Sequence, residues 1–427
     1  MYQIQQRSEI PHRLQAVVLG ASVGSYSLAR AWWEAYGTTS IMLSRADVKF
    51  ATASRFVDHR LVPDLDEEQG MVAALLAIGQ EMAEKQLIVL NGDDWHARFL
   101  AKHRAELEPY YILPVIEFDL LDRLQDKQNF YADCAAEDVA FPALRLFDCN
   151  DQSVTISVEE FSYPVVAKPS NTPAYFAADF PGKKKIFLID SPEELTSVFQ
   201  RLQASSYDKS LIVQDYVPGD DQCMRVLTCY GDESGEVVLA ALGHVLLEDH
   251  RPTAIGDFRV IINCHDDELL AAAAKLMKRW RYHGFAHFDI KWDARDQTFR
   301  FFEVNTRLGG SNYYVTSAGE NIVEWIVDDL VLGQAKSPVV IEGPHLHSAV
   351  LPLVARRSIL DPESRAQVRA LMKGGQWANP IWSAHDGWRQ RFWALVHMIN
   401  EVRLFRRYLW QTPDFQARRT AWAAQAG

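Results

Sequence analysis

Three side chains of complementary chemistry occupy alternate positions near residue 305. Glu303, Asn305 and Arg307 follow two phenylalanines in the segment FFEVNTRLGGSNYY, which covers residues 301–314. Successive side chains of a β-strand point to opposite sides, so every second residue shares a face. A carboxylate, an amide and a guanidinium on one face could bind a hard cation and an anion. The alternative is a polar strand face that contacts only water.

Residues 284–293 are predicted to form the partner strand of this segment. They alternate between an apolar set and a polar set, which are Ala286, Phe288, Ile290 and Trp292 against His287, Asp289 and Lys291. The sequence DARDQ that follows predicts a turn. If this loop has five residues, so that Asp293 faces Phe299, then Asp289 lies opposite Glu303.

Two facing carboxylates need a physical explanation. At about 5 Å and an effective dielectric constant near 20, their repulsion costs roughly 3 kcal/mol. A divalent cation between Asp289 and Glu303 would remove that cost, and the same register brings Asn305 opposite His287 as a further ligand. Mg²⁺ takes such oxygen ligands when it accompanies a nucleotide. Arg307 could then hold a transferring phosphoryl group.

Lysines and acids at strand ends extend this hypothesis. Lys168 closes the apolar run YPVVAK, and Lys183–Lys185 follow a glycine in a predicted loop. Ammonium groups at such positions could contact phosphates, although surface lysines are the alternative. The segment LIVQDYVPGDD ends a further strand in a turn with Asp220 and Asp221, which suits hydrogen bonds to a base and a ribose.

The elements that must position these side chains follow in a recognisable order. Residues 14–37 read as strand, turn and helix, and more strands and helices alternate up to residue 94, as a parallel α/β layer requires. Later segments read as a small α+β lobe, then as long strands with one helix, and then as a tail rich in Trp and Arg. We therefore predict four regions, namely 1–125 (α/β), 126–220 (small lobe), 221–335 (large lobe with the metal site) and 336–427 (mostly helical).

Bulk composition excludes several classes of protein. The 427 residues are 48% hydrophobic, enough for packed cores, and the net charge of -12 disfavours nucleic acid and anionic membrane surfaces. Five cysteines without CxxC spacing argue against a disulfide framework and favour a reducing cytoplasm. The N-terminal residues lack the apolar core of a signal peptide, and no run of apolar residues is long enough to span a membrane.

Six motifs carry a resemblance to a known family. DKQNFY, PVVAKP, GKKKIF, VQDYVPGDD, FDIKWD and FFEVNTR occur in this order between residues 125 and 320, and together they resemble the ATP-grasp ligases. Within that family, LGGSNYYVTSAGEN at residues 308–321 is similar to the D-aspartate ligases, which add D-aspartate to a peptidoglycan precursor. The resemblance implies an ATP-grasp fold with an N-terminal Rossmann-like pre-ATP-grasp domain and a helical C-terminal extension.

The resemblance also implies roles for the residues at matching positions. For ATP, these are Lys127 and Lys168 on the phosphates, Lys185 in a loop over them, Gln214, Asp215, Tyr216 and Val217 around adenine, and Asp221 on the ribose. For the reaction, they are Asp289, Glu303 and Asn305 on Mg²⁺ and Arg307 on an acyl phosphate. Two departures leave the acid substrate open. Thr306 and Gly310 stand where D-aspartate ligases tend to have Pro and Arg. The sequence around Asn305 is also similar to the biotin carboxylase branch.

The resulting hypothesis is a cytoplasmic ligase that uses ATP and Mg²⁺. ATP would phosphorylate a carboxylate, D-aspartate first of all, and an amine such as the side-chain amine of a peptidoglycan precursor would then expel phosphate. Another amino acid, a peptide or bicarbonate is the alternative acid. The cation that a dianionic acid requires could be Arg225, Arg259 or Lys291.

Two hypotheses of other classes stay open. The turn at Gly20, in GASVGSYS, could hold a nicotinamide cofactor of a Rossmann-type oxidoreductase, although its glycine spacing departs from GxGxxG and a plain tight turn is the simpler interpretation. The chain could also bind a nucleotide as a regulator without turnover.

Overall fold

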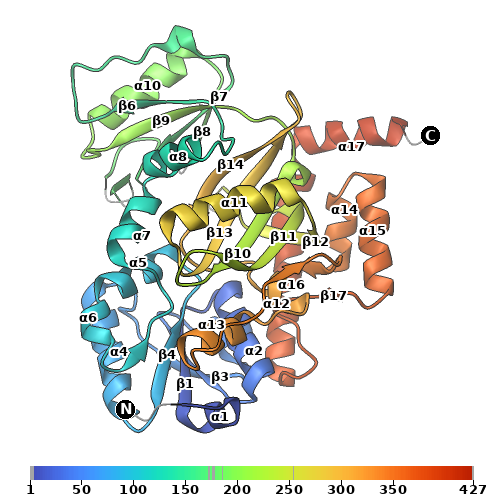
Figure 1. Ribbon diagram of the computed structural model, residues 1–427. Helices are drawn as coiled ribbons and strands as arrows, with labels where there is room; N and C mark the ends of the chain where they lie inside the picture. Colours follow the sequence, from blue (N-terminus) through green and yellow to red (C-terminus); the bar gives the residue numbers. More distant parts are fainter. Residues whose placement is uncertain (1–3, 172–173, 176–177, 185, 253, 426–427) are drawn as a thin grey trace.

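Three β-sheets stacked along one direction organise the chain (Figure 1). The computed structural model describes residues 4–171, 174–175, 178–184, 186–252 and 254–425. In Figure 1 the N-terminal sheet lies at the bottom, the largest sheet in the middle and a small sheet at the top, with the C-terminal helices α14–α17 along the right side.

The N-terminal sheet is the predicted parallel layer. Its strand order is β3-β2-β1-β4-β5, and every neighbouring pair is parallel. The strands are β1 Leu14–Leu19, β2 Ser40–Ser44, β3 Val57–Leu61, β4 Gln86–Leu90 and β5 Tyr111–Ile112. The helices of this part are α1 Ile10–Arg13, α2 Val23–Tyr36, α3 Lys49–Thr52, α4 Glu68–Glu81, α5 Asp94–Lys102, α6 Arg104–Leu107 and α7 Phe118–Gln125, with the 3-10 turn η1 Arg7–Glu9.

The turn between β1 and α2 is closed by another part of the chain. Gly20 has φ +79°, and Ser22 caps α2 by accepting a hydrogen bond from the Ser25 amide. A Cβ on Gly24 would lie 3.1 Å from the Gly310 Cα, and Asn312 Nδ2 donates to the Gly24 carbonyl. The start of α2 is thus packed against the segment after β14, which leaves it without the open approach that a dinucleotide pyrophosphate needs.

The small sheet is antiparallel, with the order β6-β9-β7-β8. Its elements are α8 Lys127–Ala136, β6 Leu144–Asp148, η2 Val158–Glu160, β7 Val165–Pro169, β8 Phe187–Ile189, α10 Pro192–Gln203 and β9 Ser210–Asp215. Helix α10 begins at a Ser191 cap followed by Pro192, which cannot donate a backbone hydrogen bond and favours a first helical position. Its buried face, which includes Leu195 and Phe199, packs in the core of this sheet.

The largest sheet has eight strands, in the order β14-β13-β10-β11-β12-β16-β17, with β15 paired to β11. Its strands are β10 Met224–Gly231, β11 Val237–Glu248, β12 Phe258–Cys264, β13 Gly284–Asp293, β14 Thr298–Asn305, β15 Val339–Ile341, β16 Leu346–Ser348 and β17 Trp377–Ala378. Associated elements are η3 Asp221–Cys223, α11 Asp267–Trp280, α12 Tyr313–Ser317, α13 Ile322–Leu330, α14 Pro352–Ser358, α15 Pro362–Lys373, α16 Trp388–Phe405, the π-helical η4 Arg406–Trp410 and α17 Pro413–Gln425. The C-terminal region thus contributes three short strands as well as helices. The four-region division stays a proposal.

The turn of the β13–β14 hairpin differs from the prediction. Asp293 pairs with Thr298, so the prediction that it faces Phe299 is wrong, and the loop is the four residues 294–297. The physical reason is that Asp293 forms hydrogen bonds with the turn itself, accepting from the Arg295 amide and side chain.

A β-bulge restores the predicted pairing further along the hairpin. Ile290 pairs with Phe301 and Asp289 with Glu303, so Phe302 is the extra residue of β14. Without the bulge, Glu303 would share the apolar face with Phe301, because a slip of one residue moves a side chain to the other face. The bulge therefore brings Glu303 to the face of Asp289.

The apolar face of the same hairpin lies in the protein core. Ala286, Phe288, Ile290 and Phe301 are buried and pack with Leu276 and Trp280 of α11. At about 25 cal/mol per Å² of buried apolar surface, each of the large side chains, such as Phe288 and Ile290, contributes roughly 2 kcal/mol, which fixes the hairpin in place. The opposite, polar face is held in one orientation as a result.

Candidate active site

The polar face of the hairpin brings together the three side chains predicted to hold a cation. Asp289 and Glu303 lie opposite each other, and Asn305 Nδ2 donates to Asp289 Oδ2 at 3.2 Å. His287, next to Asp289 on this face, is buried, with Nε2 at 3.8 Å from Asp289 Oδ1. Burial, and then the charge of Arg307, lowers the pKa of His287 to about 3, so it is a neutral neighbour at physiological pH.

Asp289 is a carboxyl whose hydrogen bonding is incomplete. Its Oδ1 is buried and accepts no hydrogen bond from the described residues. Burial, and then the negative charge of Glu303, raises the pKa of Asp289 well above its usual range. A cation beside this carboxyl would favour its ionised form and lower its pKa.

This donor set fits Mg²⁺ that arrives with a nucleotide. Over the residues that the structure describes, no three His, Cys, Asp or Glu side chains form a group able to hold a metal ion by themselves. Two carboxylates and an amide need further oxygen ligands, which nucleotide phosphates supply. The assignment of Asp289, Glu303 and Asn305 to Mg²⁺ remains a prediction, and the orphaned Asp289 Oδ1 supports it.

Lys127 is closer to the carboxylates than the sequence indicated. It is the first residue of α8, and its Nζ lies 2.9 Å from Glu303 Oε2. Burial opposes its charge, but the attraction of Glu303 outweighs burial and raises the pKa of Lys127. The Lys127 ammonium therefore offsets part of the repulsion between Asp289 and Glu303, which the sequence-based hypothesis assigned to a metal ion alone.

Lys168 is buried in a small polar network. Its Nζ donates to Tyr131 Oη at 2.9 Å, and Tyr131 Oη donates to the carbonyl of Phe302, the bulge residue, at 2.8 Å. Burial, and then the charge of Lys127, lowers the pKa of Lys168 to about 7. A polyphosphate beside it would favour the charged form. Tyr131 is a residue that sequence reasoning missed, although it closes the motif DKQNFY.

The segment predicted to hold adenine follows directly on this network. Strand β9 ends at Asp215, and Gln214 Oε1 accepts a long hydrogen bond of 3.4 Å from Tyr131. Val217 is buried, and the Tyr216 ring centroid lies 5.6 Å from Lys291 Nζ. The part that residues 214–217 play in base binding remains a prediction.

Asp221 already has partners in this structure. Its Oδ2 accepts from the Glu248 amide at 3.0 Å and contacts His250 Nε2 at 2.9 Å. Burial opposes the charge, yet His250 lowers the pKa of Asp221. Contact with a ribose, still a prediction, would share Oδ2 or use the second oxygen.

The predicted lysine loop is described only in part. Lys185, the residue predicted to cover the phosphates, lies outside the described residues. Lys183 Nζ donates to the Ala178 carbonyl, and the Lys184 carbonyl accepts from Tyr175.

Arg307 links the hairpin to the N-terminal sheet. Its Nη2 lies 2.8 Å from Asp94 Oδ2 on α5 and 3.2 Å from Asn305 Oδ1. Burial opposes its charge, but Asp94 raises the pKa of Arg307. Its Nε is buried and has no hydrogen-bond acceptor among the described residues. Asp94 is a second residue that sequence reasoning missed, because it is 213 positions away.

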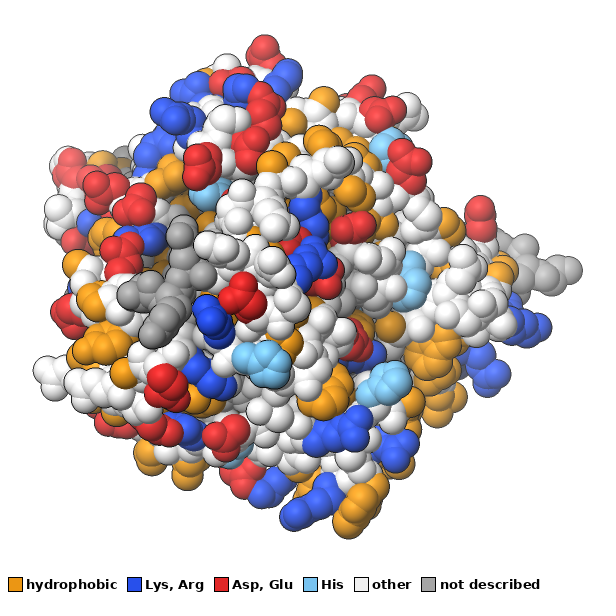
Figure 2. All heavy atoms as spheres, turned by 60° about the horizontal axis from the view of Figure 1, so that its bottom comes forward, with side chains coloured by type: hydrophobic (Ala, Val, Ile, Leu, Met, Phe, Trp, Pro, Cys, Tyr) orange, Lys and Arg blue, Asp and Glu red, His pale blue; other side chains and the backbone are white. Residues whose placement is uncertain are grey.

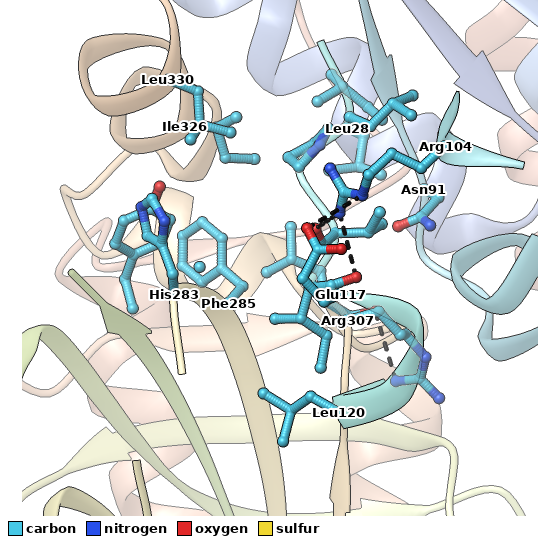
Figure 3. A pocket seen from close by; sticks show the side chains of 18 of the residues that line it. Leu28, Asn91, Arg104, Glu117, Leu120, His283, Phe285, Arg307, Ile326 and Leu330 are labelled. Carbon is cyan, nitrogen blue, oxygen red and sulfur yellow. Dashed lines mark hydrogen bonds and ion pairs between the residues drawn. The ribbon is translucent and has the colours of Figure 1, made fainter. Parts of the chain in front are cut away.

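Arg307 also lines a cavity of about 280 Å³ between the N-terminal sheet and the hairpin (Figure 3). Asn91, Arg104 and Glu117 line one side, and Phe285, Ile326 and Leu330 line the other. The Asn91 amide nitrogen is buried and donates no hydrogen bond to the described residues. Arg104 Nε forms an ion pair of 3.3 Å with Glu117. Two side chains that line the cavity, Asn91 and Arg307, therefore each carry a buried donor without an acceptor among the described residues.

The three cations proposed for a dianionic acid lie elsewhere. Arg259 is buried against Asp249, and its Nε is 3.9 Å from Glu401. Arg225 donates to the backbone carbonyls of Gln222 and Met224, and Lys291 donates to Gly219. None of the three lines the cavity, whose lining instead includes Arg104, Arg281, Arg307 and His283.

The chain is similar to one curated enzyme over most of its length. It is 32% identical over 325 residues to the D-aspartate ligase of Enterococcus faecium (strain Aus0004). The aligned residues cover 74% of this chain and 77% of that enzyme. No protein-family model matches the sequence.

Solved structures of several ligases and carboxylases share the fold. The L-amino acid ligase from Bacillus licheniformis has a TM-score of 0.53 at 16% identity, over 75% of this chain and 74% of that one. The N5-carboxyaminoimidazole synthetase from Staphylococcus aureus, crystallised with ADP, has a TM-score of 0.58 at 14% identity over 87% and 88%. The biotin carboxylase domain of the Hydrogenobacter thermophilus 2-oxoglutarate carboxylase, crystallised with MgADP, has a TM-score of 0.58 at 15% identity over 78% and 73%.

Proposed function

The chain belongs to the ATP-grasp carboxylate–amine ligases, ATP-dependent enzymes that release ADP, and from this premise we propose that it joins D-aspartate to an amine. The amine in this proposal is the side-chain amine of a peptidoglycan precursor. The name of the E. faecium relative supports D-aspartate as the acid, and the resemblance of residues 308–321 suggested the amine.

One observation carries the proposal. Arg307 contacts Asn305 on the carboxylate face and also lines the cavity with unsatisfied donors. The place for a transferring phosphoryl group and the place for an acid thus meet at a single guanidinium. A ligase that activates a carboxylate requires this adjacency.

The proposed reaction has two steps. A carboxylate oxygen of the acid attacks the γ-phosphorus of ATP, the bond to ADP breaks, and an acyl phosphate forms. The amine, as its free base, attacks the acyl carbon, inorganic phosphate leaves, and a proton is released to water. Positioning and charge neutralisation supply the rate enhancement, so no nucleophilic side chain is needed.

This chain's residues have distinct parts in these steps. Arg307 would bind the transferring phosphoryl group and then the acyl phosphate. Lys127 and Lys168 would bind the phosphates of ATP, which agrees with their burial near Glu303. Mg²⁺ held by Asp289, Glu303 and Asn305 would neutralise developing charge on the phosphates.

The cavity lined by Asn91 and Arg104 is the proposed site for the acid. An amino dicarboxylate carries one ammonium and two carboxylates. The cavity lining has one carboxylate, Glu117, together with the Asn91 amide, His283 and three arginines, Arg104, Arg281 and Arg307. Bicarbonate, the acid of the biotin carboxylase branch, has no ammonium for Glu117 to receive. The charges therefore favour an amino acid.

Phosphate release from ATP and Mg²⁺ tests the proposal over a panel of D- and L-amino acids, with and without a peptidoglycan precursor. D-aspartate should give the fastest release, and Glu303→Ala should abolish it without unfolding the chain. Release that depends on another amino acid or on bicarbonate would replace D-aspartate with that acid. No release with any acid would contradict the ligase reaction.

Variants of the cavity test the acid site separately. Arg104→Gln should raise the KM for the acid by at least about tenfold and leave the KM for ATP unchanged. Arg225→Gln is the matched control, since Arg225 does not line the cavity. Equal effects of the two variants would contradict the placement of the acid.

A further inference from the structure

Helix α16 presents a continuous apolar stripe to solvent. Trp388, Phe392 and Ile399 are 74%, 53% and 45% exposed, and Leu395 and Val396 complete the stripe. These five positions lie within an arc of about 100° on a helix of 3.6 residues per turn. Soluble proteins seldom expose so many large apolar side chains in one place, and such patches indicate interaction sites.

Positive charge surrounds the stripe. Arg389, Arg403, Arg406 and Arg407 are exposed along its edge and beyond its C-terminal end. The one acidic residue between 388 and 412 is Glu401, which is buried and faces Arg259. Figure 2 shows that acidic side chains are sparse at its lower right, on the side of the molecule that holds α14–α17, where Lys, Arg and apolar side chains gather.

A hollow at the end of the stripe repeats this chemistry. About 420 Å³ in volume, it lies between α14 and the end of α16 and is lined by Leu353, Arg357, Val402, Arg406 and Trp410, together with two glutamine side chains. The Arg357 guanidinium stacks over the Trp410 ring at 4.5 Å. The hollow thus combines two arginines with apolar side chains, and none of the described carboxylates lines it. This combination suits an anionic headgroup attached to an apolar chain.

The rest of α16 is fixed to the protein, so the face is preformed. Gln390 Nε2 donates to the carbonyls of Phe50 and Ile381, and the His397 ring packs on Phe50 with centroids 4.5 Å apart. Ala394, Met398 and Phe405 are buried on the same side. Docking on this face requires no rearrangement of the helix.

We propose that α16, with the hollow beside α14, is a docking surface for an anionic lipid bilayer. Exposed Trp and Phe on one helix face with flanking arginines are the features of helices that lie in the membrane interface. No helix in the described part of the chain combines the length and apolar composition that a membrane crossing requires, so the helix would lie on the bilayer.

Charge selects this occupant over a second copy of the chain. In a two-fold symmetric dimer through α16, antiparallel helices would place Arg389 of one copy near Arg403 and Arg406 of the other, with no exposed carboxylate on the helix to pair with them. The net charge of -12 disfavours contact with an anionic surface at long range. Screening within about 8 to 10 Å leaves the local arginines to decide contact.

Flotation of the full chain with vesicles tests the proposal. The protein should bind vesicles of phosphatidylglycerol and phosphatidylcholine and not vesicles of phosphatidylcholine alone, and binding should weaken as salt is raised. The triple variant Trp388→Ser, Phe392→Ser, Ile399→Ser should lower the partition coefficient at least about tenfold. Leu61→Ser with Leu188→Ser, two residues similarly exposed elsewhere, is the matched control and should bind as the unaltered chain does.

Two results would overturn the proposal. One is equal binding of the triple variant and the control to the anionic vesicles. The other is sedimentation of the unaltered chain as a dimer that α16 substitutions dissociate, combined with no binding to vesicles. The thermal unfolding midpoint checks the fold of each variant, and Phe392→Ser alone, with a smaller loss of binding, replaces the triple variant if that fails to fold.

Discussion

Asp289 and Asp293 lie four residues apart on the same face of β13, yet the protein treats them in opposite ways. Asp293 is fully buried, and its two oxygens accept hydrogen bonds from Arg295 and Arg300. Asp289 receives one bond from Asn305 and faces Glu303, and its Oδ1 has no donor among the described residues. The hydrogen bond and charge of Arg295 hold the pKa of Asp293 well below its usual range, whereas burial and Glu303 raise that of Asp289.

The difference separates a carboxylate that stabilises the fold from one kept for a ligand. A buried carboxylate with every hydrogen bond made has no remaining affinity for a cation. A buried carboxyl with a free oxygen beside a second carboxylate is destabilising until a cation arrives. Both residues are aspartates on the same face of β13, so only their hydrogen-bond and charge partners distinguish the two functions.

The largest expected effect is on turnover. Asp289→Asn and Glu303→Gln should each lower kcat by about 10³-fold, because each removes a proposed ligand of Mg²⁺. Asp293→Asn, the matched control on the same strand, should leave kcat within about twofold when assayed well below its unfolding temperature. Phosphate release measures all three, and a comparable loss in Asp293→Asn would remove the distinction.

Stability should show the reverse order. Asp293→Asn should lower the free energy of unfolding by about 2 kcal/mol at pH 7, since it leaves Arg295 and Arg300 without their shared carboxylate. Asp289→Asn should leave that free energy unchanged or raise it by about 1 kcal/mol, because it removes repulsion by Glu303. Urea unfolding without nucleotide and with a metal chelator measures both. A loss of stability in Asp289→Asn as large as that in Asp293→Asn would contradict the comparison.

The pH dependence of stability should also differ in sign. The raised pKa of Asp289 means that the folded state keeps a proton that the unfolded chain loses above about 3.8, so unfolding free energy falls as pH rises through this window. The lowered pKa of Asp293 gives stability that is present above 3.8 and lost as pH falls. The stabilisation in Asp289→Asn should therefore grow from pH 4 to pH 7, while the destabilisation in Asp293→Asn should vanish toward acid pH. Unfolding curves over this range test both signs.

The smallest effect concerns a buried cation of the same site. Because the pKa of Lys168 is lowered to about 7, much of it is neutral at pH 8, and bound polyphosphate should return a proton to it. ATP binding at pH 8 should thus be accompanied by the uptake of about one proton. Calorimetry in buffers of different ionisation enthalpy measures this uptake. Lys168→Met should abolish most of the uptake, and an unchanged value would show that Lys168 does not contact the phosphates.

Local pattern was sufficient to predict much of this architecture. Alternation along residues 284–293 and 301–307 predicted the polar face, and the pairing of Asp289 with Glu303 is confirmed. The run of strands and helices from residue 14 onward predicted the parallel N-terminal sheet, which is also confirmed. Both depend on periods of two or 3.6 residues, which neighbouring residues encode.

Other features could not be read from neighbouring residues. The bulge at Phe302 corrects a register that the turn alone would have misplaced, and the pair of phenylalanines at 301 and 302, an interruption of the alternation, was the one local sign of it. Lys127 beside Glu303 and Asp94 beside Arg307 join segments that are far apart in the chain. No periodicity carries information about such contacts.

By itself, then, the sequence determined which side chains share a strand face and which segments alternate as strands and helices, because those properties follow from backbone geometry over a few residues. Only the tertiary structure decided which carboxylate keeps an oxygen without a hydrogen bond from the described residues, which arginines line the cavity and which side of α16 meets solvent. Those outcomes depend on how distant segments pack, and packing chooses among side chains that the local pattern treats as equivalent.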